Sequence, residues 1–433
     1  MLQELKRYRH VLGQLTPNMY LLLAGASLVG LGTGIISTFF NIYLKQGGFG
    51  EAFLGKLNSL GTIGSLALAI PAGLLVNRLG GRASLVLSAG LIAVFSALQA
   101  GGLVPAALVA LQIGLSASNM LYGATYNPEV MSNTDPAVRQ AAFSMTFTAG
   151  TFTSVIASAV GGFLPRFFAR LGASAFLSLR LTLVVGAVLI LSSTVVFSRL
   201  RVRQAVSTVT AANLPSADAG ESEAVPSWRR YALRYVFVNV IIGFGAGMTI
   251  PYLNLYFAGR FHADTVVIGA LFAVSNVVLT LGALMAPWLT RRIGPLRTIA
   301  LTATGSLVFL VVMAFATDIV VAAIAFWMRA CLMMCSTPVT NQFCLELVPS
   351  SRRSVIHNVY QMAWTGSWAI ATAIGGKLIE TGGFKIPMLV TAAVYGLYVV
   401  VFILAFRRHP IMQQPIPVTP PKQSMIADQN VGM

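Results

Sequence analysis

An arginine inside a long apolar run is the residue whose chemistry is easiest to define. Arg329 lies about ten residues into the run 319–346, which places it about 15 Å deep at a rise of ~1.5 Å per residue. An ionisable side chain at such a depth is costly and marks a functional site by default. A carboxylate or phosphate would pair with the guanidinium bidentately, so Arg329 is a candidate for binding an anionic group. The alternative is that Arg329 bonds to carbonyls and amides across a helix interface.

Uncharged polar and aromatic residues near the middle of other apolar runs form a second candidate set. Tyr360, Trp364 and Trp368 recur at i, i+4 and i+8, hence on one helical face. Such a face beside a few amides and hydroxyls suits an amphipathic ligand, although aromatic stripes also serve packing or face lipid. The expected binding residues beside Arg329 are Thr33, Ser37, Asn119, Tyr122, Thr148, Thr151, Phe244, Asn276, Tyr360, Trp364 and Trp368.

These residues belong to a chain with the composition of an integral membrane protein. Of its 433 residues, 56% are hydrophobic and 9% are charged, and the mean hydropathy is +0.78. Soluble chains average about 25% charged residues. Apolar runs of about 20 residues or more indicate spanning helices. We predict an all-α protein with twelve of them, at residues 17–44, 52–77, 83–101, 104–130, 141–164, 174–198, 231–258, 265–290, 296–316, 319–346, 354–378 and 386–406.

A shift of 214 residues relates the two halves of the chain. It carries Asn77-Arg78-Leu79-Gly80 onto Arg291-Arg292-Ile293-Gly294, each a basic turn between two apolar runs. The same shift carries Arg139 onto Arg353, and residues 157–162 onto 371–376, which both end in Gly-Gly. Matches at one constant offset indicate an internal repeat. The sequence therefore predicts two copies of one six-helix unit.

The net charge of +17 does not require a nucleic acid, because the charge is unevenly distributed. With the N-terminus inside, most of the 29 Lys and Arg residues fall in cytoplasmic segments, which follows the positive-inside rule. Basic clusters at helix ends also attract anionic lipid headgroups. We expect a multi-pass protein of the cell membrane, with both termini in the cytoplasm, membrane lipids as partners and no nucleic acid.

Composition also divides the chain along its length. Residues 1–16 form a basic amphipathic lead-in, 17–199 and 230–408 the two bundles, 200–229 a polar cytoplasmic linker, and 409–433 a disordered Pro- and Gln-rich tail. Cys331, Cys335 and Cys344 fall in one predicted helix and are expected to be packing thiols. No nucleophile with a neighbouring base, metal set or phosphate loop appears at mid-depth. We expect no cofactor, no metal and no enzymatic activity.

Taken together, these features resemble the major facilitator superfamily. The resemblance rests on two repeats of six helices, a long central loop and the turn Gly73, Arg78, Gly80 and Arg82, and it covers residues 17–407. Asn77 stands where the family usually has an aspartate. Members are alternating-access transporters, whose halves rock about a central site. The resemblance thus implies a secondary transporter but not its substrate. From Arg329 and the polar and aromatic residues we expect a small organic solute that is amphipathic and a candidate anion, and we expect the protein to work as a monomer.

The resemblance also implies a gate on the cytoplasmic side, where the basic turns pair with acidic helix ends. The alternative is that these charges simply snorkel to the headgroups. The residues expected to form the gate are Gly73, Asn77, Arg78, Gly80, Arg82, Glu129, Arg139, Arg291, Arg292, Glu346, Arg352 and Arg353.

Two further kinds of cargo fit the same architecture. A broad-specificity drug exporter working by proton antiport would prefer cations, and an acid-free aromatic interior would also tolerate the acyl chains of a lipid or lysolipid. A proton is a candidate coupling ion, but Glu129 and Glu346 are the sites that could carry it, and both are peripheral. Ala157-Ser158 also replaces the Gly-Pro pair that drug antiporters of the family carry before Gly-Gly.

Overall fold

The computed structural model describes residues 16–102, 104–134, 139–201, 228–348 and 352–407, and these ranges are helical throughout except for short turns. No strand occurs in these ranges, so the predicted all-α class is confirmed. The predicted lead-in, linker and tail fall almost entirely outside the described residues.

Six helices form the N-terminal half: α2 (Pro17–Gln46), α3 (Glu51–Leu79), α4 (Gly81–Gly101), α5 (Pro105–Ser132), α6 (Arg139–Arg170) and α7 (Ala175–Ser198). Pro17 and Pro105 stand in the first turn of their helices. The N–H groups of that turn have no partner within the helix, so proline loses no hydrogen bond there. Ser174 caps α7 by accepting the N–H of Leu177 at 3.2 Å.

The C-terminal half repeats this pattern with one interruption. It contains α8 (Trp228–Thr249), the 3-10 turn η2 (Ile250–Tyr252), α9 (Leu253–Arg260), α10 (Thr265–Ile293), α11 (Pro295–Phe315), α12 (Ile319–Glu346), α13 (Arg353–Gly382) and α14 (Lys385–Phe406). The span predicted at 231–258 is therefore broken into α8 and α9. Pro251 lies in the break. Because proline has no N–H to donate, it interrupts the hydrogen bonds of the helix at this point.

The internal repeat is visible in the helix boundaries. Adding 214 to both ends of α3, α4 and α5 gives both ends of α10, α11 and α12. The turns of the repeat also match, since Gly80 and Gly294 have φ angles of 77° and 84°. The predicted basic turn is shorter than expected: Gly73 to Leu79 are the last residues of α3, and Gly80 alone separates α3 from α4.

Ten of the described helical spans, with α8 and α9 taken as one, are long and apolar enough to cross a membrane, and α3, bent by 55° at Pro71, makes eleven. The remaining long helix, α13, carries polar residues such as Lys377 and Glu380, but it packs against the spanning helices α3 and α8. The described part of the chain is thus consistent with the twelve predicted spans.

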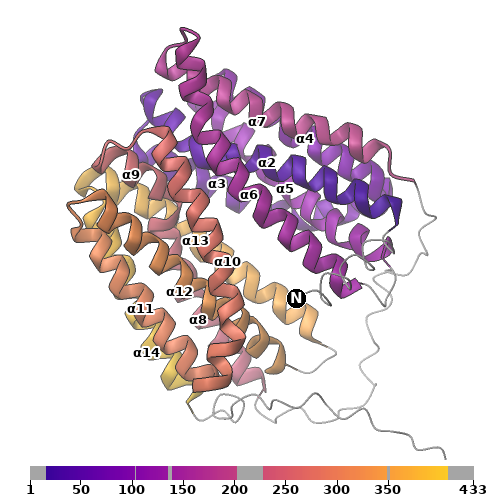
Figure 1. Ribbon diagram of the computed structural model, residues 1–433. Coiled ribbons are helices and arrows are strands. Elements are labelled where there is room, and N and C mark those ends of the chain that lie inside the picture. The colour runs from indigo at the N-terminus through magenta and orange to yellow at the C-terminus, as the bar shows by residue number, and fades with distance from the viewer. Residues whose placement is uncertain (1–15, 103, 135–138, 202–227, 349–351, 408–433) are drawn as a thin grey trace, which may run out of the picture.

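The two bundles meet near α9 and separate toward the opposite end (Figure 1). The joined end contains the turn between α2 and α3 and that between α13 and α14; the open end contains the turns at Gly80 and Gly294, the start of α2 and the end of α14. One buried apolar cluster draws on both halves and includes Phe39, Tyr43, Tyr252 and Phe257 of the joined end. Two other clusters, nearer the open end, each lie within one half.

Substitution of the turn glycine tests whether the basic turn is set by backbone conformation. Gly80 has φ 77° and ψ 165°, a region that costs a residue with a Cβ on the order of 1–3 kcal/mol. Nothing lies within 4 Å of a Cβ at Gly80 or at Gly73, so only conformation distinguishes them. We expect Gly80→Ala to lower the melting temperature of the purified protein. Gly73→Ala, inside α3, should leave it equal or slightly higher; equal melting of both variants would contradict this reading of the turn.

Candidate functional site

A cavity of about 440 Å³ lies beside the joined end, between the two halves. All but two of its lining residues come from the N-terminal half, and Pro251 and Trp368 close it from the other side. The lining consists of Thr33, Ile36, Ser37, Phe40, Asn41, Asn58, Thr62, Ile92, Ser96, Gln99, Gln112, Leu115, Asn119, Pro251 and Trp368.

The polar groups of this cavity are amides and hydroxyls, and no ionisable side chain is among the lining residues. Gln99 of α4 donates from Nε2 to Oε1 of Gln112 on α5 at 2.8 Å, which fixes both amides across the cavity wall. Gln99 Oε1 is buried and accepts no hydrogen bond from the described residues. A buried acceptor of this kind gains stability from a donor brought by a ligand or water. The cavity therefore offers a ligand hydrogen bonds from uncharged groups and no ion pair.

Aromatic surface completes the lining. Phe40 of α2 and Trp368 of α13 both line the cavity, and the Trp368 ring contacts Trp364 with centroids 4.9 Å apart. Aromatic rings favour stacked or edge contacts with other planar groups. A ligand with one planar face and several hydrogen-bonding edges would match this wall.

A reciprocal pair of asparagines joins the two halves beside the cavity. Asn41 of α2 donates to the carbonyl of Pro251 at 2.8 Å, and Asn254 of α9 donates to the carbonyl of Thr38 at 2.8 Å. The two side chains also approach each other at 3.4 Å. A shift of 213 residues exchanges both donors and both acceptors, so the two bonds are related by the pseudo-twofold of the repeat. The pair links the halves at the joined end, and Asn41 also lines the cavity.

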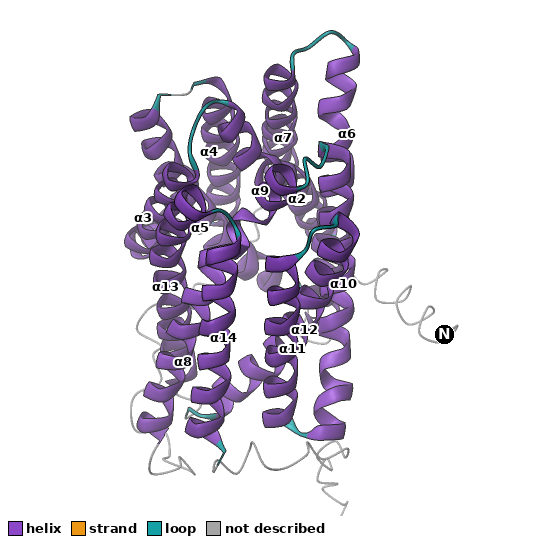
Figure 2. Ribbon diagram, turned by 90° about the vertical axis from the view of Figure 1, so that its left-hand side faces the viewer, coloured by secondary structure: helices purple, strands orange, loops and turns teal. Residues whose placement is uncertain are grey.

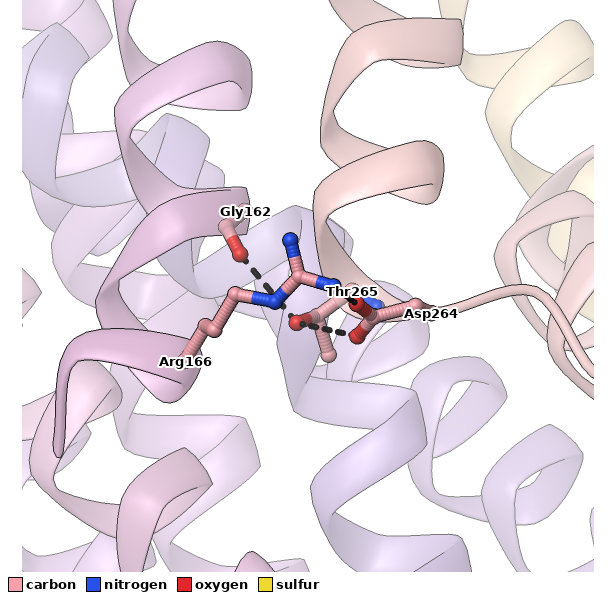
Figure 3. Close-up of polar contacts among 4 residues, drawn as sticks. All are labelled: Gly162, Arg166, Asp264 and Thr265. Atoms are coloured by element: carbon pink, nitrogen blue, oxygen red, sulfur yellow. Dashed lines mark hydrogen bonds and ion pairs between the residues drawn. The ribbon is translucent and has the colours of Figure 1, made fainter. Parts of the chain in front are cut away.

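Two further polar contacts join the halves at equivalent positions. Arg166 of α6 forms an ion pair with Asp264, which caps α10, at 3.0 Å (Figure 3). Glu380 of α13 accepts the N–H of Ala52 in the first turn of α3 at 2.7 Å. The 214-residue shift carries Arg166 onto Glu380, so one position of the repeat uses a cation and the other an anion. The Glu380 carboxylate thus accepts a free N–H at the N-terminus of α3, where a negative charge is favourable.

Small residues allow these helices to approach closely. A methyl group at Gly162 of α6 would lie 2.8 Å from the carbonyl oxygen of Thr265, and Thr265 Oγ1 donates to the Gly162 carbonyl at 3.1 Å (Figure 3). At the repeat-related Gly376, an added methyl would collide with the carbonyl of Glu51. The Gly-Gly pairs found in sequence thus lie at the contact between the halves, as small residues do where membrane helices pack closely.

The structure brings together only part of the predicted binding set. Thr33, Ser37, Asn119 and Trp368 line the cavity. Tyr360 is buried against Tyr235 of α8, with ring centroids 4.6 Å apart, and Tyr122 stacks on Tyr126 inside the N-terminal half. Outside the cavity lining lie Tyr122, Thr148, Thr151, Phe244, Asn276, Tyr360 and Trp364.

Asn276 has a different position from the one expected. It extends from α10 to the Ser154 carbonyl and the Ser158 hydroxyl of α6, each at 3.4 Å, so it bridges the halves. The polar cavity residues not expected from sequence are Asn41, Asn58, Thr62, Ser96, Gln99 and Gln112. Gln99 and Gln112 could have been found as uncharged amides inside or at the end of apolar runs, whereas Asn41 and Asn58 stand near predicted helix ends.

Arg329 lies inside the C-terminal half and is absent from the cavity lining in this conformation. Its side chain is 6% exposed, and Tyr395 of α14 is its polar neighbour. Arg329 Nε has no hydrogen-bond partner among the described residues, and no ion pair joins it to a described carboxylate. The guanidinium is thus enclosed by its own bundle.

The expected gate residues lie at the open end, where the halves are apart. Asn77, Arg78, Arg82, Arg291, Arg292 and Arg352 are exposed, and neither ion pair of the described residues includes them. Glu129 is held by Asn133, which donates to its carboxylate at 3.1 Å, and the carboxylate lies against Gly81 at the start of α4. The side chains of Arg139, Glu346 and Arg353 lie outside the described residues.

Comparison with known proteins identifies the family. The model of the Major Facilitator Superfamily matches residues 22–372 and 235–428, so the chain belongs to this superfamily. It is therefore a multi-pass membrane transporter rather than an enzyme. No curated protein matches the chain in sequence.

Solved structures share the fold at low identity. The nucleoside transporter NupG is similar with a TM-score of 0.74 and 15% identity, over 90% of this chain and 100% of that one. A bacterial homologue of the human lysosomal transporter Spinster, in an inward-facing and unoccupied conformation, gives 0.73 and 14%, over 90% and 98%. A bacterial homologue of the iron transporter ferroportin in an inward-facing state gives 0.72 and 17%, over 90% and 98%.

Removal of the asparagine pair tests whether its hydrogen bonds keep the joined end closed to reagents outside the cavity. In a background without Cys331, Cys335 and Cys344, a cysteine at Ser37 would report access to the cavity. We expect Asn41→Ala and Asn254→Ala each to increase labelling of this cysteine by a membrane-impermeant thiol reagent added at the joined end, because each change removes an inter-half hydrogen bond of about 0.5–1.5 kcal/mol.

Asn58→Ala serves as the matched control, since Asn58 lines the cavity but forms no side-chain hydrogen bond to the other half among the described residues. It should not increase labelling from that side. Labelling that is equal in the parent and in both asparagine variants of the pair would show that closure of the joined end does not depend on it.

Proposed function

We propose that this protein is an alternating-access carrier for a small, neutral, hydrogen-bonding solute that bears a planar ring. The observation that carries the proposal is the 440 Å³ cavity lined by amides, hydroxyls and aromatic rings, without an ionisable side chain. Its volume lies within the roughly 300–1,000 Å³ typical of small-molecule sites. The nucleoside transporter NupG, which has the same fold, is a precedent for a solute of this kind.

The proposed orientation follows from the charge distribution. The open end carries Arg78, Arg82, Arg291 and Arg292, and the positive-inside rule places such clusters in the cytoplasm. The cavity would then be open to the cytoplasm and sealed from the outside. The solute would exchange with the cytoplasm in this state and reach the outside after the halves rock.

Rocking would exchange one set of contacts for another. The exposed ion pair of Arg166 and Asp264 is a weak latch, because surface pairs contribute about 0–1 kcal/mol. The buried asparagine bonds and the glycine contacts would contribute more than this ion pair to the state in which the joined end is closed. In the alternate state we propose that the basic turns and Glu129, now apart from the other half, form the closing contacts of the gate expected from sequence.

The lining gives a proton no carboxylate or imidazole to bind within the cavity. We therefore propose facilitated movement of the solute down its own gradient rather than proton antiport. The enclosed position of Arg329 likewise favours a neutral solute over an anionic one.

Neutral nucleosides and their 5′-monophosphates make a matched test, since each pair shares a ring system and differs in charge. We expect the purified protein to bind a neutral nucleoside more tightly than its monophosphate in thermal-shift and calorimetric titrations. Gln112→Leu should weaken this binding about tenfold, because a lost hydrogen bond leaves the Gln99 amide unpaired in a buried wall. Thr148→Ala, outside the cavity, should leave it unchanged.

Uptake into vesicles completes the test. A protonophore should not abolish equilibration of the neutral solute. Tighter binding of the monophosphate, lost on Arg329→Ala, would establish the anionic alternative, and preference for cations with collapse by protonophore would establish the drug-exporter alternative.

A further inference from the structure

A second concave site lies on the outer surface of the C-terminal half, away from the central cavity. It is a groove of about 670 Å³ between α8 and α14, which run side by side in both views (Figures 1 and 2). The groove uses the first turns of α8 and the last turns of α14, so it lies at the open end. Its walls are Leu233, Arg234, Val236, Phe237, Val240, Val401, Leu404 and Ala405.

The walls are apolar and turned outward. Leu233 is 71% exposed, Phe237 58% and Leu404 60%, and they face away from both bundle cores. In a membrane-spanning bundle such a surface is covered by acyl chains rather than water. The groove is therefore open sideways to the bilayer.

Arg234 is the one charged residue of the groove. Its Nη1 donates to the carbonyl of Ala405 at 3.3 Å, and its guanidinium lies 5.5 Å from the centre of the Tyr231 ring. These two contacts hold the cation at the mouth of the groove, and no carboxylate of the described residues pairs with it. Arg234 lies six positions after Trp228, or about 9 Å along the helix, a distance over which an arginine can reach the headgroups.

The surrounding charge is one-sided. Arg229 and Arg230 precede Arg234 on α8. Residues 228–263 and 385–407 contain no Asp or Glu. The stretches of α8 and α14 that form the mouth of the groove are therefore basic.

We propose that this groove is a binding site for an anionic phospholipid of the leaflet at the open end. The phosphate would pair with Arg234, and one acyl chain would lie between Phe237 and Leu404. An acyl chain explains the apolar walls, and a phosphate explains the fixed cation, because basic pockets between membrane helices bind anionic headgroups. A water-soluble solute would gain nothing from walls that open to the bilayer. This site is independent of the solute carried in the central cavity.

Native mass spectrometry of the full chain, released from vesicles of phosphatidylglycerol and phosphatidylcholine in equal amounts, would count the bound lipids directly. We expect the parent protein to retain phosphatidylglycerol in preference to phosphatidylcholine. Arg234→Ala should reduce the retained phosphatidylglycerol about fivefold, which corresponds to about 1 kcal/mol for one arginine near the surface. Ala405→Trp, which fills the groove, should remove the lipid of either headgroup.

Arg292→Ala is the matched control. Arg292 also lies at the open end of a spanning helix, with its guanidinium 4.7 Å from the centre of the Trp288 ring. It lines neither this groove nor the central cavity. Its loss should leave lipid retention unchanged. The proposal is wrong if Arg234→Ala retains as much phosphatidylglycerol as the parent, or if Arg292→Ala loses as much, since the latter would indicate general surface charge. Equal retention of the two lipids by the parent would also overturn it.

Discussion

Close backbone contact between the two halves near the joined end is the constraint on which the described structure depends. Glycines make the contact possible, since a methyl group at Gly162 would come 2.8 Å from a carbonyl of α10 and one at Gly376 would collide with a carbonyl of α3. The reciprocal bonds of Asn41 and Asn254 then satisfy polar groups that the contact buries. Because the described residues of the two halves separate toward the opposite end (Figure 1), the cavity remains reachable from there.

Pseudo-symmetry determines where these contacts lie, but chemistry differs between the copies. The repeat places Arg166 and Glu380 at equivalent positions, and each binds the start of a helix in the opposite half by a different group. The cavity is more asymmetric still, since Pro251 and Trp368 are its contribution from the C-terminal half. One copy thus supplies most of the cavity lining, and the other contributes Pro251 and Trp368 to it and contains the buried Arg329 and the outer groove.

Sequence predicted the fold well because membrane insertion leaves a strong signal in composition. The expected spans 265–290 and 319–346 differ from α10 and α12 by three residues at most, and the 214-residue repeat recurs in the helix boundaries. The residues of the site were harder to predict, because the depth of a residue in a helix does not say which way its side chain points. Arg329 was correctly placed inside a span but faces its own bundle, whereas Trp368, on the same aromatic face as the buried Tyr360, lines the cavity. Contacts between the halves could not be predicted from one chain without knowing which helices meet.

The most direct test of this account is the distance between the halves at both ends, measured by pulsed electron spin resonance with and without solute. One label pair at Asn77 and Arg291 reports the open end, and another at Arg170 and Thr381 reports the joined end; all four residues are exposed. The account predicts that a bound solute populates a state in which the first distance shortens while the second lengthens. Two distances that stay fixed, or that change in the same direction, would contradict movement of the halves about the central cavity.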